Sequence, residues 1–484
     1  MSFSPLADLE RHAVEQPDAV ALATPRSLLT FAELRDAVLS ITRRLRHAGV
    51  RPGDLVALDL PTALEWIVDL ALFRLAARTV SLRGLGAPGP LAIGLLLTEP
   101  GRRAVSARRI IEVDDRWVTD PWIDGSRSSP RDEPAADFPG PDEIFRYLLT
   151  SGTTGTPRAA AYSIRAFEYR LAHGAAHWTD GRPELTMIGM STTGGFHAAV
   201  GALHHGIPYL AIDSIDPESM EFAASQGIRV LCGSPMQVAH ALHVMVDTGL
   251  TLPELEEVRL AGAGPSAGLL DFIATHLGVA VRGVYGSTEG GGVSQIWYSP
   301  TSDRFDVGAP LPDVELQVVD ADGLPLPVGS EGGVRYRNPG LVSGYLVGGA
   351  VEPLPGGWFV PGDRGVLTKS GSLVLAGRDS ELLNIGGVKI DPARIDELAA
   401  VFPGVRDAAA FGFERHAGIP AVGLAVVTEA DCDLRALDRS LRDRMPTGHP
   451  TAYWRLDGIP RSRLGKALRA KLADDYERGR AARG

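Results

Sequence analysis

The stretch that decides the fold reads Leu148-Leu-Thr-Ser-Gly-Thr-Thr-Gly-Thr-Pro-Arg158, where hydroxyl side chains and glycines follow an apolar run. A short loop of this composition can offer several backbone N–H groups and hydroxyl donors to one anion. It is not a Walker A loop, because the GxxxxGK[ST] pattern does not occur in the chain. The plain structural alternative is a surface turn, but so dense a run of donors favours a phosphate-binding loop.

Composition indicates a folded, soluble protein: 44% of the 484 residues are hydrophobic, and this length predicts two or more domains. The opening MSFSPLADLE lacks the basic and apolar regions of a secretory signal. Apolar runs such as Leu91 to Leu97 are far shorter than a membrane span. Only Cys232 and Cys432 occur, which excludes a disulfide framework and a multi-cysteine metal site. We therefore expect a cytoplasmic protein without a membrane span.

Charge narrows the range of partners. A formal net charge of -11 disfavours broad binding to nucleic acid or anionic membranes, although a local cluster of donors could hold a small anion. Basic residues are nearly all arginine, since the only lysines are Lys369, Lys389, Lys466 and Lys471. Each lysine therefore raises the question whether a compact ammonium charge is needed at its position. For most of the four, chance retention is the simpler explanation.

Local patterns in the first part of the chain predict layered α/β structure. Thr30 to Glu33 reads as a capping box, apolar residues follow at helical spacing, and Gly49 follows as a stop. Leu55 to Leu58 predicts a short strand, and the order helix, turn, strand recurs between Gly262 and Tyr285. Residues 124–142 are rich in Pro, Ser and Asp and predict an exposed connector.

The character of the chain changes after Phe305. From Phe305 to Leu375 short apolar stretches are punctuated by glycine, which is typical of β-hairpins in a small barrel or sheet. Asp391-Pro392 then begins a helix with one apolar face around Ile395, and strand-like segments follow at Ala408 to Phe413 and Ala421 to Val427. This final stretch of roughly 100 residues is long enough to form a separate domain.

Five further motifs stand in order along the chain. They are Ala261-Gly-Ala-Gly-Pro265, Tyr285-Gly-Ser-Thr-Glu289, Gly362-Asp363, Gly377-Arg378 and Pro460-Arg-Ser-Arg-Leu-Gly-Lys466. With the loop at 148–158 they resemble, in the same order, the signatures of the acyl-adenylate-forming superfamily of acyl- and aryl-CoA synthetases, peptide-synthetase adenylation domains and luciferase. The resemblance covers nearly the whole chain, and six motifs in sequence make coincidence negligible.

The resemblance implies an α/β fold with two domains. Residues 1–378 would form an N-terminal adenylation domain of layered α/β subdomains plus a small β-barrel, and residues 379–484 a smaller, mobile α+β lid domain. It also implies ATP-dependent activation of a carboxylic acid to acyl-AMP, with Mg²⁺ and release of pyrophosphate. A carboxylate oxygen attacks the α-phosphorus, so charge on three phosphates must be held by positioning and electrostatics.

The family pattern, carried over residue by residue, implies a nucleotide site. The residues expected to hold the β- and γ-phosphates are Thr150, Ser151, Gly152, Thr153 and Thr154, and Gly155 and Arg158 belong to the same nucleotide-binding set. Thr288 would donate to the α-phosphate, and Glu289 would bind Mg²⁺, which prefers one or two carboxylates plus phosphate oxygens. Tyr285 would stack on adenine, and Asp363 would accept from both ribose hydroxyls. The nucleotide-binding set is completed by Gly264, Gly286 and Arg378.

Lys466 is the expected catalytic lysine. Its ammonium could bridge the carboxylate and the α-phosphate, which a compact charge does better than a planar guanidinium. Each site residue also has a simpler explanation: an exposed lysine at a helix start, a solvated loop acid at Glu289, a turn residue at Asp363, and a structural ion pair for Arg378. The ordered motifs favour the functional interpretation.

The chain departs from the family pattern at several positions. Arg158 stands where lysine is usual and Ala159 where glycine is usual, but the charge is kept, so we expect ATP binding to survive. Ser380 replaces the usual Asp or Lys of the hinge, and Asn384 replaces a lysine common in CoA ligases. Domain rotation lets the family use one site twice, so these two changes disfavour CoA, whereas Gly386-Gly387 favours it.

The expected acid pocket is small and neutral in character. Its predicted residues are Thr192, Thr193, Gly194, Phe196, Ser234, Ala261, Gly262 and Gly290. Small residues leave room, which favours an aromatic or bulky acid over acetate. No acidic residue stands where relatives that activate α-amino acids hold the substrate amine. His197, His204 and His205 lack a metal-ligand spacing, so structural histidines are the simpler interpretation.

The acceptor of the acyl group is left open between classes. CoA is the leading prediction, and an amine or a separate carrier protein is the main alternative. Activation of an unusual oxyanion such as nitrite is a minor one. The non-enzymatic alternative is a degenerate nucleotide-binding protein, against which the intact Ser151, Glu289, Asp363 and Lys466 argue. No nucleic-acid partner is expected.

Overall fold

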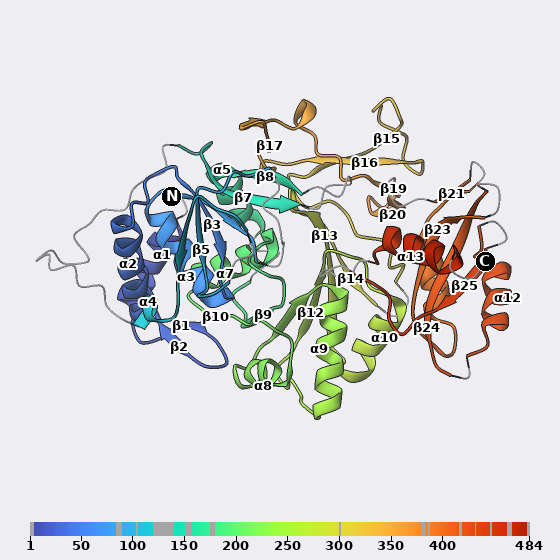
Figure 1. Ribbon diagram of the computed structural model, residues 1–484, viewed down its shortest axis with the longest axis horizontal. Helices are drawn as coiled ribbons and strands as arrows, with labels where there is room; N and C mark the ends of the chain where they lie inside the picture. The colour runs from blue at the N-terminus through green and yellow to red at the C-terminus, as the bar shows by residue number, and fades with distance from the viewer. Residues whose placement is uncertain are drawn as a thin grey trace, which may run out of the picture.

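The computed structural model describes residues 4–83, 90–102, 105–119, 140–150, 157–174, 180–299, 302–378, 383–385, 388–415, 419–430, 432–445, 448–461 and 467–481. The molecule is elongated, with the helices of the N-terminal region at one end and the C-terminal region at the other (Figure 1). The predicted connector at 124–142 lies largely outside the described residues. Among the described helices, none has the length and apolarity that a membrane crossing requires.

The largest sheet has eight strands in the order β18-β17-β8-β7-β4-β3-β5-β6. They are β3 (Leu55–Asp59), β4 (Arg78–Ser81), β5 (Leu95–Thr98), β6 (Arg109–Glu112), β7 (Ile144–Thr150), β8 (Arg158–Ser163), β17 (Gly344–Val347) and β18 (Ala350–Glu352). The strands from β3 to β7 pair in parallel, and β8, β17 and β18 continue the sheet in antiparallel pairs. The predicted strand at Leu55 is confirmed as β3.

Helices connect and cover these strands. They are α1 (Pro5–Glu15), α2 (Phe31–His47), α3 (Thr62–Arg74), α4 (Arg116–Thr119), α5 (Ile164–Tyr169), the π-helical turn η2 (Arg170–Gly174) and α7 (Thr193–His205). The predicted capping box is confirmed: the Thr30 hydroxyl accepts from the Glu33 backbone N–H at 3.2 Å, and the Glu33 carboxylate accepts from the Thr30 N–H at 2.9 Å. These reciprocal bonds satisfy two N–H groups that a helix start leaves free.

A second α/β unit contains a five-stranded sheet in the order β14-β13-β12-β11-β9. Its strands are β9 (Glu184–Thr186), β11 (Val230–Gly233), β12 (Glu257–Ala261), β13 (Ala280–Ser287) and β14 (Gly291–Tyr298), and its helices are α8 (Pro217–Ser225), α9 (Pro235–Thr248) and α10 (Ala267–His276). A small sheet, β10-β1-β2, consists of β1 (Val20–Ala23), β2 (Leu28–Thr30) and β10 (Tyr209–Leu210). The helix, turn, strand order predicted between Gly262 and Tyr285 is confirmed by α10 and β13.

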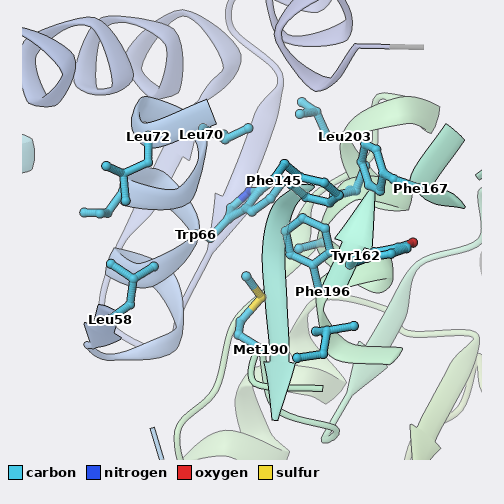
Figure 2. Packing of buried hydrophobic residues seen from close by; sticks show 14 of the residues in the cluster. Leu58, Trp66, Leu70, Leu72, Phe145, Tyr162, Phe167, Met190, Phe196 and Leu203 are labelled. Carbon is cyan, nitrogen blue, oxygen red and sulfur yellow. The ribbon is translucent and has the colours of Figure 1, made fainter. Parts of the chain in front are cut away.

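An aromatic core joins the large sheet to α3 and α7. Trp66 on α3, Phe145 on β7 and Phe196 on α7 pack together, with Tyr162 on β8 beside them (Figure 2). Trp66 and Phe196 meet edge to face with centroids 6.3 Å apart, a favoured aromatic geometry. The rigid packing of α7 against the sheet fixes its N-terminus, where predicted pocket residues lie.

The segment expected to form a small β-barrel contains a four-stranded antiparallel sheet, β15-β16-β19-β20. Its strands are β15 (Glu315–Val319), β16 (Glu331–Arg337), β19 (Asp363–Leu367) and β20 (Leu373–Arg378). The 3-10 helical turn η3 (Pro355–Gly357) directly precedes β19 in the chain. The β17–β18 hairpin leaves this group and joins the large sheet. Residues 305–311 hydrogen-bond to β20 on one side and approach β14 on the other, so the sheet is joined to the five-stranded one.

The last region packs around its own hydrophobic residues. It contains β21 (Leu383–Ile385), β22 (Val388–Ile390), α11 (Pro392–Ala400), β23 (Val405–Glu414), β24 (Pro420–Thr428), α12 (Leu434–Arg444), β25 (Ala452–Arg455) and α13 (Arg469–Ala481). Two hydrophobic clusters lie wholly within it, one around Ile395 and one around Phe411. The predicted helix and strands are confirmed. Separate packing supports the predicted domain boundary near Arg378, which stays a prediction.

Candidate active site

The ends of the predicted phosphate loop are held by a β-hairpin. Thr150 closes β7, Arg158 opens β8, and the two residues are paired in register. Ser151, Gly152, Thr153, Thr154 and Gly155 lie outside the described residues. The structure therefore fixes where the loop begins and ends: at the end of β7 and the start of β8, the strand that pairs with β17.

Glu289 is held beside this hairpin by Tyr345 on β17. The Tyr345 hydroxyl donates to Oε1 of Glu289 at 2.6 Å, and the Arg158 guanidinium lies 3.3 Å from the centre of the Tyr345 ring. Burial, the nearby Glu289 charge and this hydrogen bond raise the pKa of Tyr345, so it stays a neutral donor. Within the described residues no Lys, Arg or His forms an ion pair with Glu289. A buried carboxylate whose charge is not neutralised fits a divalent cation.

Arg170 anchors the turn that carries Thr288 and Glu289. Its guanidinium donates to the backbone carbonyl oxygens of Gly340 at 2.7 Å, Glu289 at 2.6 Å and Thr288 at 3.3 Å. Thr193 adds a 3.3 Å bond from its hydroxyl to the same Thr288 oxygen. Arginine is donor-only with a planar fork, so one buried side chain can satisfy several carbonyls that converge. These side-chain bonds fix the backbone of the turn, which lies outside the strands and helices.

Three predicted nucleotide residues meet at the end of β13. The Tyr285 hydroxyl donates to Oδ2 of Asp363, and Arg378 Nε donates to Oδ1, both at 2.6 Å. Burial and the Asp363 charge raise the pKa of Tyr285. Both oxygens of the carboxylate are thus already bonded. A ribose would have to share or replace these donors.

A cavity of about 440 Å³ lies beside Arg170, Thr193 and Thr288. Predicted pocket residues that line it are Thr192, Thr193, Gly194, Ser234, Ala261, Gly262 and Gly290. Thr288 and Gly286 of the predicted nucleotide set also line it, so the predicted acid pocket and the predicted phosphate-binding turn share one wall. Phe196 does not, because its side chain is buried in the aromatic core against Trp66 (Figure 2). Gly264 lies in the exposed turn before α10 and is not part of the lining.

Local sequence explains this wall. Thr192 caps α7, since its hydroxyl accepts from the Gly195 N–H, and Ser234 caps α9 through a capping box with Gln237. Two helix N-termini are therefore set at the cavity. Gly286 and Gly290 are required by close packing: a Cβ would lie 2.1 Å from the Gly291 oxygen or 2.4 Å from the Tyr336 ring, respectively.

His197 and Tyr162 form a buried pair at the same cavity. The Tyr162 hydroxyl lies 2.7 Å from His197 Nε2, and His197 lines the cavity. Burial, with help from the charges of Arg170 and Arg146, lowers the pKa of His197 to about 3. Its imidazole is therefore neutral at physiological pH. The described residues contain no cluster of three or more His, Cys, Asp or Glu that could hold a metal ion.

Comparison with known proteins decides the family. The family of AMP-binding enzymes matches residues 9–346, which is more than half of the chain. The chain belongs to this family. The prediction of an AMP-forming, acid-activating enzyme is confirmed at that level.

Individual relatives are more distant. Naringenin synthase of Pestalotiopsis fici is 29% identical over 96% of the chain, which spans only 18% of that protein. The 2-succinylbenzoate–CoA ligase of Geobacillus kaustophilus is 28% identical, with 96% of each covered. The amide bond synthetase McbA of Marinactinospora thermotolerans superposes with a TM-score of 0.79 at 23% identity, over 98% of this chain and 100% of that one. That likeness shows the fold alone, and it confirms the predicted α/β architecture.

Several residues of the site were not predicted from the sequence. Arg170, Tyr162 and Tyr345 had no motif to mark them, because each acts through a partner distant in the chain. The sequence favours a structural role for His197, and only its place in the cavity distinguishes it. Lys466 lies outside the described residues, so its role stays a prediction.

Proposed function

We propose that the chain uses ATP to activate a bulky or aromatic carboxylic acid and then transfers the acyl group to CoA. In the first step a carboxylate oxygen forms a bond to the α-phosphorus. The bond from that phosphorus to the bridging oxygen breaks, and pyrophosphate leaves with the electron pair. The products are acyl-AMP and pyrophosphate. In the second step a thiolate displaces AMP from the acyl carbon.

The observation that carries this proposal is the shared wall of the cavity. Thr288 lines the cavity and directly precedes Glu289, so an acid in the cavity would meet the α-phosphate at that turn. The lining is rich in glycine, alanine and aliphatic residues, which suits a bulky apolar body. A volume of about 440 Å³ is within the range of drug-sized ligands and far exceeds what acetate needs.

Magnesium fits the site at Glu289, beside the ends of the phosphate loop. When bound, Mg²⁺ would neutralise charge on the phosphate oxygens. The chain's own groups would do the rest. Tyr345 orients the Glu289 carboxylate, Arg170 fixes the backbone of the turn, and Asp363 would receive the ribose hydroxyls.

An amine or a separate carrier protein is the second candidate acceptor. Ser380 and Asn384 depart from the pattern of CoA ligases, and that departure is the observation in its favour. Both classes share the first step. The acceptor therefore has to be tested separately from activation.

The test is a pyrophosphate-release screen over a panel of carboxylic acids with ATP and Mg²⁺. Each responding acid is then tested with CoA, with simple amines and with neither. We expect release with at least one aromatic or bulky acid and faster turnover with CoA. Absence of release across the panel would refute activation, while stimulation by amines alone would replace CoA with an amine acceptor.

A further inference from the structure

The hydrogen-bond pattern at Tyr162 fixes which nitrogen of His197 carries the proton. The Arg170 guanidinium lies over the Tyr162 ring, 4.6 Å from its centre. Arginine can only donate, so the Tyr162 proton must go elsewhere. Tyr162 is fully buried, and a buried hydroxyl proton needs an acceptor. The acceptor at hand is His197 Nε2, 2.7 Å away.

A neutral imidazole that accepts at Nε2 must carry its hydrogen on Nδ1. Donation from the buried Tyr162 hydroxyl therefore makes His197 Nδ1 a donor. Among the described residues, no acceptor lies within hydrogen-bonding distance of Nδ1, although three other histidines on helices bond in this way to the preceding turn. Figure 2 shows the Tyr162 hydroxyl directed away from Trp66, out of the aromatic core.

Two side-chain amides that line the cavity, Gln237 and Asn338, each use both their oxygen and their nitrogen in bonds to the backbone. Gln237 accepts from the Ser234 N–H at 2.9 Å and donates to the Met187 carbonyl at 2.5 Å. Asn338 accepts from the Gly340 N–H at 2.8 Å and donates to the Gly290 carbonyl at 3.1 Å. These two amides shape the wall, whereas His197 retains a donor for a ligand.

We infer that His197 is a specificity-determining residue, whose Nδ1–H donates to a hydrogen-bond acceptor on the body of the acid. The preferred substrates are then aromatic or bulky acids that carry a neutral acceptor, such as a carbonyl, an ether oxygen or a ring nitrogen, away from the carboxylate. Because the imidazole is neutral, it forms no ion pair with a second negative charge on the acid and does not favour acids that carry one. This inference rests on the proposed function, because it takes the cavity as the acid site.

The test measures binding of matched acids by calorimetry without ATP, so that it does not depend on turnover. The probes are benzoic and phenylpropenoic acids substituted in pairs of similar shape: acetyl against isopropyl, and methoxy against ethyl, at each ring position. For the wild-type protein we expect the acceptor-bearing member of at least one pair to bind about tenfold more tightly. In His197→Phe that ratio should fall to about one.

Two further variants separate recognition from structure. His197→Asn keeps an N–H near the position of Nδ1 and should retain part of the preference. Tyr162→Phe removes the proton that fixes the tautomer and should reduce the preference. His243→Phe alters an exposed histidine on α9 and should leave the ratio unchanged. The wild-type tautomer can be read directly from the nitrogen-15 shifts of His197, where the expected form is protonated at Nδ1.

The outcomes are distinct from those of the proposed function. Equal binding within every pair, binding of no acid, or a preference that survives His197→Phe would each overturn the inference. A loss of affinity that is equal for both members of a pair would also overturn it, because a merely structural role predicts that result. Selective binding without pyrophosphate release would support the inference and refute activation.

Discussion

The hydroxyl of Tyr345 donates a 2.6 Å hydrogen bond to Oε1 of Glu289, and the same tyrosine ring lies under the guanidinium of Arg158. One aromatic side chain thereby connects the strand that follows the predicted phosphate loop to the predicted metal ligand. The sheet supplies the geometry, because Tyr345 on β17 is paired with Ala160 on β8. We therefore expect that a change in the β7–β8 hairpin, which carries the predicted phosphate loop, will alter the position of the Glu289 carboxylate through Tyr345.

Glu289→Gln is expected to raise the Mg²⁺ concentration needed for half-maximal pyrophosphate release by at least tenfold. It removes the negative charge that attracts the cation and leaves the side-chain volume unchanged. Tyr345→Phe should give a shift of only a few-fold, since one hydrogen bond is worth about 1 kcal/mol. The measurement is a Mg²⁺ titration at saturating ATP. Glu331→Gln, at an exposed carboxylate, is the control, and a normal titration for Glu289→Gln would remove Glu289 from the metal site.

Arg170→Met is expected to lower kcat/KM for activation at least tenfold and to raise the Mg²⁺ requirement. The substitution leaves the carbonyls of Thr288, Glu289 and Gly340 without their donor, at about 1–3 kcal/mol for each buried group. Arg170→Lys should recover only part, because an ammonium cannot reproduce the fork. Arg229→Met, at an exposed ion pair with Glu256, is the control. A loss of stability with an unchanged Mg²⁺ titration would show that Arg170 does not position the turn.

The motifs predicted the fold and part of the cavity wall because they depend on local chemistry. Thr192 and Ser234 are helix caps, and a cap is visible within four residues of sequence. Gly286 and Gly290 are similarly local, since they belong to one hairpin. Such signals can be recognised in the sequence without knowledge of tertiary contacts.

Arg170 and Phe196 show what the sequence could not provide. Arg170 bonds to Gly340, 170 residues away, and nothing in a single sequence indicates that pairing. Phe196 is predicted to line the pocket, yet α7 turns it toward Trp66 because successive helical positions point in different directions. Long-range pairing and side-chain direction both require the assembled fold.

Contact between α11 and the loop before β15 is expected to depend on pH. Arg304 donates to the Glu397 carboxylate at 2.5 Å, and both side chains are largely buried. Burial raises the pKa of Glu397 to about 7, although Arg304 and Arg394 act against that rise. The undocked glutamate would titrate near 4.3. The docked state therefore binds a proton more tightly, so docking is strongest below about pH 4, weakens as the pH rises to about 7 and does not change further above it.

Small-angle X-ray scattering between pH 5 and 8 tests this dependence. The wild-type protein should become less compact as the pH rises from 5 to about 7, with little further change up to 8. Glu397→Gln carries no titrating group at this position and should flatten the profile. Glu429→Gln, at an exposed carboxylate, should leave it unchanged. A wild-type profile that Glu397→Gln does not alter would exclude Glu397 as the titrating group.

The segment that carries Lys466 is anchored at both ends. Arg461 and Ala467 form a β-bridge across it, and Arg461 is held by Asp407 on β23 through a 2.5 Å ion pair. The lysine segment thus belongs to the C-terminal region, whereas the predicted phosphate loop starts from β7. If Lys466 bridges the acid and the α-phosphate, activation requires the two regions to come together.

Lys466→Ala is expected to lower the turnover of the activation step at least 100-fold, with much smaller effects on binding of ATP or acid. The lost contact is made chiefly in the transition state, and a charged donor in a closed site is worth about 3 kcal/mol or more. Lys466→Arg should rescue little, because a guanidinium fork does not fit a single bridging point. Lys471→Ala, which removes an exposed ion pair with Asp475, is the control. Transfer from supplied acyl-AMP should be nearly unaffected in every variant. Near-normal activation by Lys466→Ala, or full activity of Lys466→Arg, would show that another group stabilises the transferred charge.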